Sequence, residues 1–265
     1  MNTKYSNPSS TKTQRWRGKA QLLANIRGFL LFLLSLILAL YVSWMINAQL
    51  GYGYSWLYHA YSIDQHIEEF APQNRFRQHF GLTTEQQHKD IFQQIVVSVH
   101  NDGVGLEAIT YDVNEPLQAR ATVVPVLHAA EIIHLQDVAH LINRIHWLAG
   151  ILTCVWLALV LLSFFSAERA SNKGMAAVFL IALTLIISLF VGVGAKEIFY
   201  QLHIWIFPAE NQWFFYYQDS LMSTLMKAPV LFAGIALQVV LLGMILFAGV
   251  LYAWLWLFKA NKSHH

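Results

Sequence analysis

One short segment of the sequence combines residue types that can bind and transfer protons. Glu131, His134 and Asp137 are spaced three residues apart. Side chains three apart on a helix are near neighbours, so Glu131 and His134 share a face and Asp137 lies obliquely beside them. A carboxylate next to an imidazole can orient the ring, fix its tautomer and raise its basicity. A surface salt pair or a capping cluster would give the same pattern.

A second segment places a histidine among aromatic residues. His203 lies between Phe199 and Phe207, and Trp213 and Asp219 follow shortly afterwards. Burial lowers the pKa of a histidine, which leaves the ring neutral and able to act as a base. An aromatic belt at a membrane surface with one snorkelling polar group would look the same.

The composition of the chain requires a membrane around these segments. Of the 265 residues, 56% are hydrophobic and only 12% are charged, whereas a soluble domain usually carries about a quarter charged residues. A helix needs about 20 mainly apolar residues to cross the roughly 30 Å hydrocarbon core of a bilayer. Four stretches without any charge meet this requirement: 28–47, 147–166, 175–195 and 230–258.

Positive charges predict the orientation of these spans. Basic residues precede the first span, Arg169 and Lys173 separate spans two and three, and Lys259 and Lys262 follow span four. Such residues hold loops in the cytoplasm, so both termini are predicted to be cytoplasmic. In chain order, the predicted segments are a basic cytoplasmic N-terminus (1–27), span one (28–47), an extracytoplasmic domain (48–146), span two (147–166), a cytoplasmic turn (167–174), span three (175–195), an extracytoplasmic loop (196–229), span four (230–258) and a cytoplasmic tail (259–265).

The first outer segment has the patterns of a small mixed domain. Thr83 or Thr84 is expected to cap a helix that runs through His100. The stretches 106–111 and 119–124 are predicted to be two short strands. The fold class is therefore an all-α membrane protein with four transmembrane helices and a small mixed α/β extracytoplasmic domain between helices 1 and 2.

The segments next to the later spans are expected to be helical. Thr122 or Val124 is predicted to begin a long helix that continues into span two. In the second outer loop, residues 208–211 form a predicted turn, and Asp219 or Ser220 caps a short amphipathic helix before span four.

His134 and His203 can lie close together only if the helices that carry them are suitably arranged. A straight helix puts His134 roughly 20 Å above Trp147, and a straight extension of span three puts His203 roughly 12 Å above Ala195. The helix that bears His134 must therefore tilt, or span three must extend beyond Ala195.

The motifs, their order and the topology resemble one family. Glu-x-x-His-Leu-x-Asp-Val lies before span two, and Phe-x-x-x-His-x-x-x-Phe, a tryptophan and Asp-Ser-Leu lie between spans three and four. The chain resembles the lipoprotein intramolecular transacylase (Lit) family of four-span membrane proteins. The residues that carry the resemblance are Glu131, His134, Leu135, Asp137, Val138, Phe199, His203, Phe207, Trp213, Asp219, Ser220, Leu221 and Pro229.

This resemblance implies an acyl shift on a bacterial lipoprotein. An acyl chain of the diacylglyceryl-modified N-terminal cysteine moves from the glyceryl group to the α-amino nitrogen, which leaves a lyso-form lipoprotein. The implied location is the cytoplasmic (inner) membrane, with the active site facing outward. The implied partners are diacylglyceryl-modified lipoprotein N-termini and membrane lipid, with no cofactor and no metal.

The resemblance also implies roles for particular residues. His134 and His203 are the implied catalytic residues. His203 would be the base toward the amine and His134 would protonate the leaving oxygen, or the roles would be reversed. The implied site-shaping or orienting residues are Glu131, Asp137, Trp213 and Asp219.

Two other classes of function stay open at this point. Glu-x-x-His is a ligand motif of di-metal helical proteins, and His203 would complete a site in a metal-dependent membrane enzyme. The only cysteine, Cys154, excludes a cysteine-built zinc site and a CxxC pair. The large outer loop also suits a non-enzymatic membrane assembly or regulatory factor. The net charge of +2 gives no nucleic-acid footprint.

Overall fold

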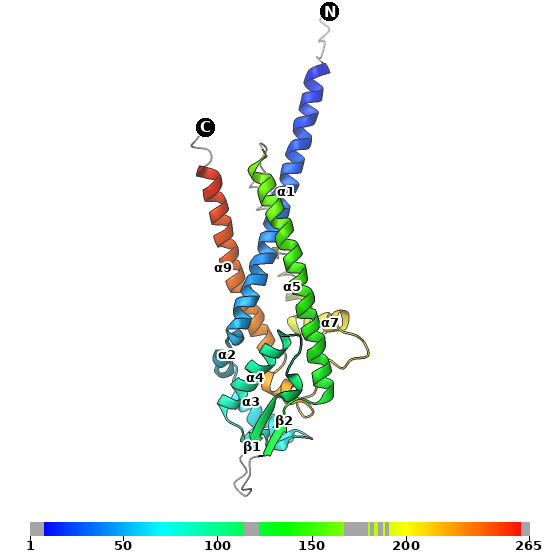
Figure 1. Cartoon of the computed structure of the whole chain (residues 1–265), viewed down its shortest axis with the longest axis vertical. Coiled ribbons are helices and arrows are strands. Elements are labelled where there is room, and N and C mark those ends of the chain that lie inside the picture. The colour runs from blue at the N-terminus through cyan, green and yellow to red at the C-terminus, as the bar shows by residue number, and fades with distance from the viewer. Residues whose placement is uncertain are drawn as a thin grey trace, which may run out of the picture.

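Long helices form the stem of the molecule and are followed by a smaller domain at one end (Figure 1). The structure is a computed structural model, and it describes residues 8–113, 122–166, 180, 183–184, 188 and 191–260. Within these ranges three helices are long and apolar enough to cross a membrane. They are α1 (Pro8–Gln49), α5 (Ala129–Phe164) and α9 (Val230–Ala260). The free ends of α1 and α9 lie at the same end of the stem (Figure 1).

The predicted span 175–195 lies mostly outside the described residues. Its described positions up to 193 are helical, and Gly194 follows with φ +91° and ψ 141°. This left-handed backbone region favours glycine, because a side chain there would be strained. The helix therefore ends at Gly194, and a separate helix, α7 (Ala195–Ile206), begins after it. Figure 1 shows α7 beside the lower part of α5, running across the direction of the stem.

Small and polar side chains join the long helices of the stem. α1 packs against both α9 and α5. Ser43 Oγ donates to the carbonyl oxygen of Val239 at 2.7 Å, and Trp156 Nε1 donates to Ser35 Oγ at 2.8 Å. In lipid, where water does not compete, such close contacts and interhelical hydrogen bonds hold helices together.

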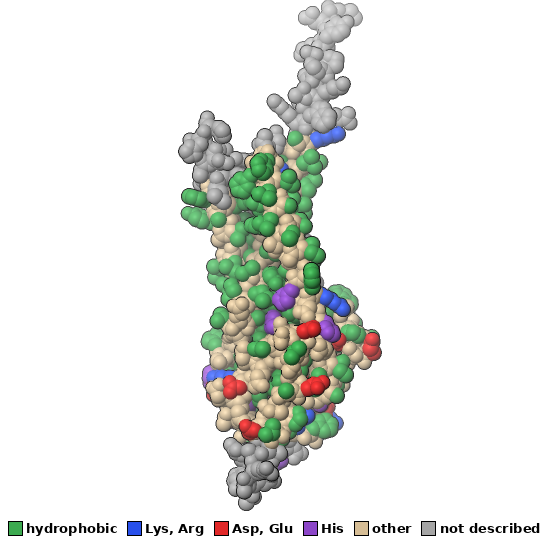
Figure 2. Space-filling view, viewed as in Figure 1, with side chains coloured by type: hydrophobic (Ala, Val, Ile, Leu, Met, Phe, Trp, Pro, Cys, Tyr) green, Lys and Arg blue, Asp and Glu red, His purple; other side chains and the backbone are tan. Residues whose placement is uncertain are grey.

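α5 is too long to lie wholly within a bilayer. Its 36 residues span about 54 Å, against a hydrocarbon core of roughly 30 Å. The charged residues Glu131, Asp137 and Arg144 all lie in its first half, toward the domain. Figure 2 shows charged side chains and histidines over this end of the molecule, and mostly hydrophobic side chains along the described part of the stem. Residues 129–146 of α5 therefore run alongside the domain, and the exposed apolar surface of the helix is continuous from near Trp147.

Short helices and a two-stranded sheet build the domain at the end of the stem, which is called the outer domain after its predicted side of the membrane. The two strands are antiparallel, with Tyr111 opposite Val124. The elements are 3₁₀ turn η1 (Gly51–Gly53), α2 (Tyr54–Ala60), α3 (Ile63–Phe70), 3₁₀ turns η2 (Ala71–Gln73) and η3 (Gln78–Leu82), α4 (Glu85–Val99), 3₁₀ turn η4 (Leu106–Ala108), β1 (Thr110–Val113) and β2 (Thr122–Pro125).

Local sequence signals predict one of these helices well and another only in part. Thr84 caps α4, because its hydroxyl accepts from Gln87 N–H while the Gln87 side chain accepts from Thr84 N–H, and His100 ends the helix as predicted. The predicted start of the long helix at Thr122 or Val124 is wrong. Those residues pair with β1, and α5 begins at Ala129 instead.

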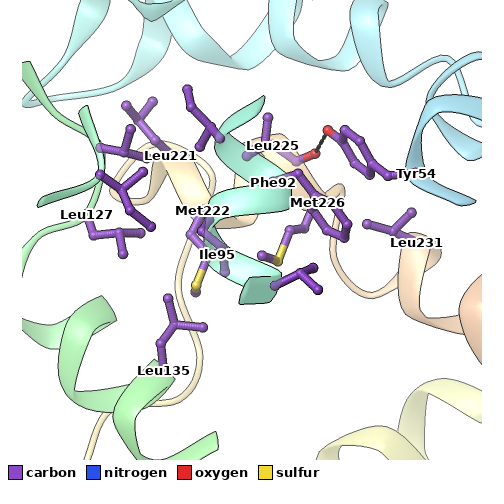
Figure 3. Close-up of a cluster of buried hydrophobic side chains, with 14 of the residues drawn as sticks. Tyr54, Phe92, Ile95, Leu127, Leu135, Leu221, Met222, Leu225, Met226 and Leu231 are labelled. Atoms are coloured by element: carbon purple, nitrogen blue, oxygen red, sulfur yellow. Dashed lines mark hydrogen bonds between the residues drawn. The ribbon is translucent and has the colours of Figure 1, made fainter. Parts of the chain in front are cut away.

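The core of the domain closes around α8 (Leu221–Met226), a short helix whose residues are all buried. Ser220 caps it through a hydrogen bond from Ser223 N–H to Ser220 Oγ at 2.9 Å. Tyr54 donates to the carbonyl oxygen of Leu225 at 2.8 Å, which fixes α8 to α2 (Figure 3). The apolar side chains around α8 in this view come from α4, α5, α9 and the segment before α5: Phe92, Ile95, Leu127, Leu135 and Leu231. The buried helix α8 therefore joins the second outer loop (196–229) to the first outer segment (48–146).

Two buried histidines give the domain a pH-dependent stability. His88 lies between Tyr58 and Thr83, whose hydroxyls bond to its two ring nitrogens at 2.8 and 2.7 Å. Burial lowers the pKa of His88 from 6.5 to about 4, and burial together with the charge of Lys227 does the same for His66. Protonation therefore favours the unfolded chain.

We expect the thermal midpoint of the purified protein to be constant above pH 6.5 and to fall steadily from pH 6.5 to about 4, since the folded histidines resist protonation in this window. The drop in pKa from 6.5 to about 4 corresponds to roughly 3 kcal/mol for His88 at most. His88→Gln removes one titrating group and should flatten the pH dependence. A midpoint that is equally high at pH 7.5 and pH 4.5 would contradict this origin of acid sensitivity.

Candidate active site

His134 of α5 and His203 of α7 lie side by side, with ring centroids 6.2 Å apart. The helix break at Gly194 precedes α7, which runs across the stem beside the lower part of α5 and brings His203 next to His134. The two histidines therefore lie close together because a new helix begins after Gly194, and not because predicted span three continues straight beyond Ala195.

Aromatic rings surround His203. The ring centroids of Phe199, Trp213 and Phe207 lie 4.0, 5.0 and 5.2 Å from that of His203. His203 Nδ1 is 2.8 Å from the carbonyl oxygen of Phe199. A carbonyl oxygen only accepts, so Nδ1 carries the hydrogen, and in the neutral ring Nε2 keeps its lone pair. This arrangement leaves Nε2 of His203 available as a base.

His134 is more deeply enclosed and lacks a partner on one nitrogen. Only 7% of the residue is exposed, and the rings of Phe207 and Phe215 lie 5.0 and 6.1 Å away. Its Nδ1 atom is buried and has no hydrogen-bond partner among the described residues. An unpaired buried polar atom is costly. The ring is therefore suited to receive a hydrogen-bonding group from a bound molecule.

Enclosure keeps both rings neutral. Burial and, to a smaller extent, the neighbouring His203 lower the pKa of His134 from 6.5 to about 4, against the opposing effect of Asp137. Burial also lowers the pKa of His203, against the opposing effect of its hydrogen bond to Phe199. At neutral pH two uncharged imidazoles face each other, and each can take up a proton.

Glu131 has a different place from the one predicted for it. Its carboxylate is completely buried and accepts hydrogen bonds from Ser220 Oγ, from Met222 N–H at 3.2 Å and from His128 N–H at 2.7 Å. In the described part of the chain no hydrogen bond joins Glu131 to His134. Glu131 instead ties the start of α8 to the start of α5, and so fixes the helix turn from which His134 projects.

The other predicted residues hold the loop between α7 and α8. Asp137 accepts from Asn211 Nδ2 at 2.7 Å, which fastens the beginning of this loop to α5. Trp213 follows in the loop and lies over His203. Asp219 forms an ion pair with Arg75 at 3.1 Å, at the far end of the loop. Asp137 and Trp213 therefore border the histidine pair, whereas Asp219 anchors the loop to the outer domain.

Sequence reasoning missed two residues of this arrangement. Phe215 is buried and contacts the rings of both His128 and His134. Arg75 holds the loop through Asp219 and through its own N–H, which donates to Gln218 O at 2.9 Å. Phe215 is one of several neighbouring aromatic residues in the sequence, and Arg75 lies far from the loop along the chain, so neither has a local signal.

No group of three or more His, Cys, Asp or Glu side chains that could hold a metal ion occurs among the residues that the structure describes. The carboxylates of Glu131 and Asp137 are bonded to Ser220 and Asn211.

The family model for the lipoprotein intramolecular transacylase Lit matches residues 26–228 of this chain. The chain belongs to the Lit family. The match covers both histidines, the loop between α7 and α8, and the whole outer domain. No curated protein sequence matches the chain.

A solved structure supports the same fold. It is an in meso structure of the membrane integral Lit from Bacillus cereus, in a variant with a histidine-to-arginine substitution. The similarity covers 97% of this chain and 100% of the other, with a TM-score of 0.60 and 12% sequence identity. At this identity the comparison concerns the fold alone.

Replacement of Glu131 tests whether this buried carboxylate stabilises the fold more than a partly exposed ion pair does. Glu131→Ala removes a buried acceptor from three donors, so we expect it to lower the free energy of unfolding by more than about 2 kcal/mol. Asp219→Asn weakens a partly exposed ion pair and should cost about 1 kcal/mol or less. Thermal unfolding in detergent micelles compares the two variants. Equal midpoints would show that Glu131 is not the anchor described above.

Proposed function

We propose that His134 and His203 form the catalytic pair of this Lit-family acyltransferase. The enzyme is a lipoprotein intramolecular transacylase, and it transfers an acyl chain within one lipoprotein molecule. The chain moves from the glyceryl group of the diacylglyceryl-modified cysteine to the α-amino nitrogen, and the product is the lyso-form lipoprotein. The observation that carries the proposal is the pair of neutral imidazoles in one aromatic enclosure.

The reaction needs a base and a proton donor, but it needs no nucleophile from the protein. The neutral amine attacks the ester carbonyl, a C–N bond forms, and the C–O bond to the glyceryl group breaks. The nitrogen loses one proton and the glyceryl oxygen gains one, so no charge accumulates over the whole reaction. Because both reacting groups belong to one substrate, binding in the right orientation supplies much of the rate enhancement.

The tautomer of His203 supports its role as the base. Nε2 has a free lone pair while Nδ1 is bound to Phe199, so Nε2 would take the proton from the attacking amine. The proton would then pass from His203 to the neighbouring His134, and His134 would deliver it to the departing glyceryl oxygen. The enclosing rings exclude water, which would otherwise hydrolyse the ester.

The remaining site residues would act through position. Asp137 holds Asn211, and the loop from Asn211 onward places Trp213 over His203. Glu131 and Asp219 fasten the other end of this loop. We assign them site-shaping roles, and we assign proton transfer to the two histidines alone.

The proposed topology has four spans in the bacterial inner membrane. Residues 28–47, 147–166, 175–195 and 230–258 cross the bilayer, with 1–27, 167–174 and 259–265 in the cytoplasm and 48–146 and 196–229 outside. The positions of Arg169 and Lys173 support this orientation. The common end of α1 and α9 agrees with it, because an even number of spans returns the chain to its starting side. The site then faces outward, where diacylglyceryl lipoproteins lie in the outer leaflet.

Single substitutions of the two histidines test the proposal directly. His134→Ala and His203→Ala should each lower transacylation by at least about 100-fold, because each removes a proton-transferring group. The measurement is mass spectrometry of lipoprotein N-terminal peptides from bacterial cells that produce each variant.

His140→Ala is the matched control. His140 is exposed on the same helix as His134, so this variant should keep the activity of the unaltered enzyme. Folding and membrane insertion are checked by purification and thermal unfolding of each variant. Full transacylation by folded His134→Ala or His203→Ala would overturn the assignment of that residue.

A further inference from the structure

α7 has two faces of opposite character. Phe199 and His203 point inward, where their rings contact each other and those of the candidate site. The last two turns also expose four large apolar side chains, with exposed fractions between 43% and 73%. They are Leu202, Ile204, Trp205 and Ile206, and together we call them the α7 face.

The polar residues of the helix lie at its other end. Lys196, Glu197 and Gln201 are exposed in the first two turns. Lys196 Nζ lies 5.5 Å from the centre of the Tyr200 ring, which keeps its charge beside α7. The exposed apolar side chains are thus concentrated in one half of the helix, and they form a patch where a soluble surface would carry polar groups.

The position of α7 indicates what covers this patch. The helix follows directly after the apolar run 175–193, across the break at Gly194, and runs across the stem beside α5. Its neighbour α5 exposes apolar side chains from Trp147 onward, which is the surface expected to meet lipid. The α7 face therefore adjoins the apolar surface of the stem at the end of that surface nearer the domain.

We propose that the α7 face is a membrane-surface binding site that inserts into the outer leaflet. Its ligand is the boundary between lipid headgroups and acyl chains. Helices of this kind lie in the plane of the interface with the apolar side buried about 5–10 Å, and tryptophan is favoured at this depth. Because His203 lies on the opposite side of the same helix, insertion sets the depth of the catalytic ring. That consequence rests on the proposed function, whereas insertion itself does not.

The insertion predicts a depth difference along a short stretch of chain. Trp205 is 73% exposed on the α7 face, and Glu210 is exposed in the turn after the helix. The only cysteine is Cys154, so Cys154→Ser gives a background for a single spin label. Trp205→Cys and Glu210→Cys in this background are labelled and reconstituted into phosphatidylcholine–phosphatidylglycerol vesicles.

Collisions with oxygen and with a water-soluble nickel chelate then report depth. The label at position 205 should respond mainly to oxygen, which concentrates in the acyl region, and the label at 210 mainly to the nickel chelate. Equal, water-like accessibility at both positions would overturn the proposal, because the α7 face would then lie in water or on another protein. This outcome is independent of whether the chain performs transacylation.

An activity measurement tests the consequence for the site. Trp205→Glu places a carboxylate at the acyl boundary and should lower transacylation in vesicles roughly tenfold, because a buried charge opposes insertion. In detergent micelles, where depth is not imposed, its activity should stay within about threefold of the unaltered enzyme. Gln94→Glu adds the same charge at an exposed position of α4, away from α7, and should act normally in both settings. Equal losses for Trp205→Glu in vesicles and micelles would mean that Trp205 supports the fold of the site and does not set its depth.

Discussion

The buried carboxylate of Glu131 is the interaction on which the rest of the site depends. It accepts from the start of α8 through Ser220 and Met222, and from the start of α5 through His128. Without these donors a fully buried carboxylate would be strongly disfavoured, so the three contacts form together or not at all. These hydrogen bonds fix the position at which the second outer loop enters the core of the domain. The turn of α5 that bears His134 then has a defined position relative to that loop.

A second constraint is the low polarity around the two imidazoles. Phenylalanine and tryptophan rings enclose them, and they offer little stabilisation to a positive charge beyond a weak interaction with the ring faces. Each ring therefore rests in its neutral form at neutral pH. In a low-polarity enclosure a charge on one ring would interact strongly with its neighbours. The same enclosure that lowers the pKa values thus couples the two rings to each other.

Much of the architecture was predictable from the sequence because the relevant signals are local. Charge-free apolar runs predicted the three long helices, and the Thr84 cap and the Ser220 cap follow from side chains next to the helices that they start. The predicted first residue of helix α5 was wrong. Thr122 and Val124 are compatible with a helix start or a strand, and pairing with a distant segment decides between them.

The sequence predicted which residues lie at the site better than it predicted how those residues are placed relative to one another. The spacing of Glu131 and His134 suggested direct contact, but the carboxylate is bonded to residues about 90 positions away in the chain, which no helical periodicity reveals. The pairing of His134 with His203 likewise depends on the change of direction at Gly194. A glycine at the end of an apolar run signals a possible break, yet the new direction of the helix is set by contacts with α5 and the loop.

Under the proposed topology, in which residues 175–195 cross the bilayer, the break at Gly194 also separates the histidine pair from variations in bilayer thickness. A span that is too long or too short for its membrane tilts or shifts to match it. A continuous helix would transmit such a movement to His203 and change its distance from His134. Here α7 is fastened to α5 through Asp137 and Asn211 and through the paired rings, while the connection to the preceding span runs through one glycine. Adjustment of that span to membranes of different lipid composition can therefore be taken up at the joint, and the geometry of the two rings is preserved.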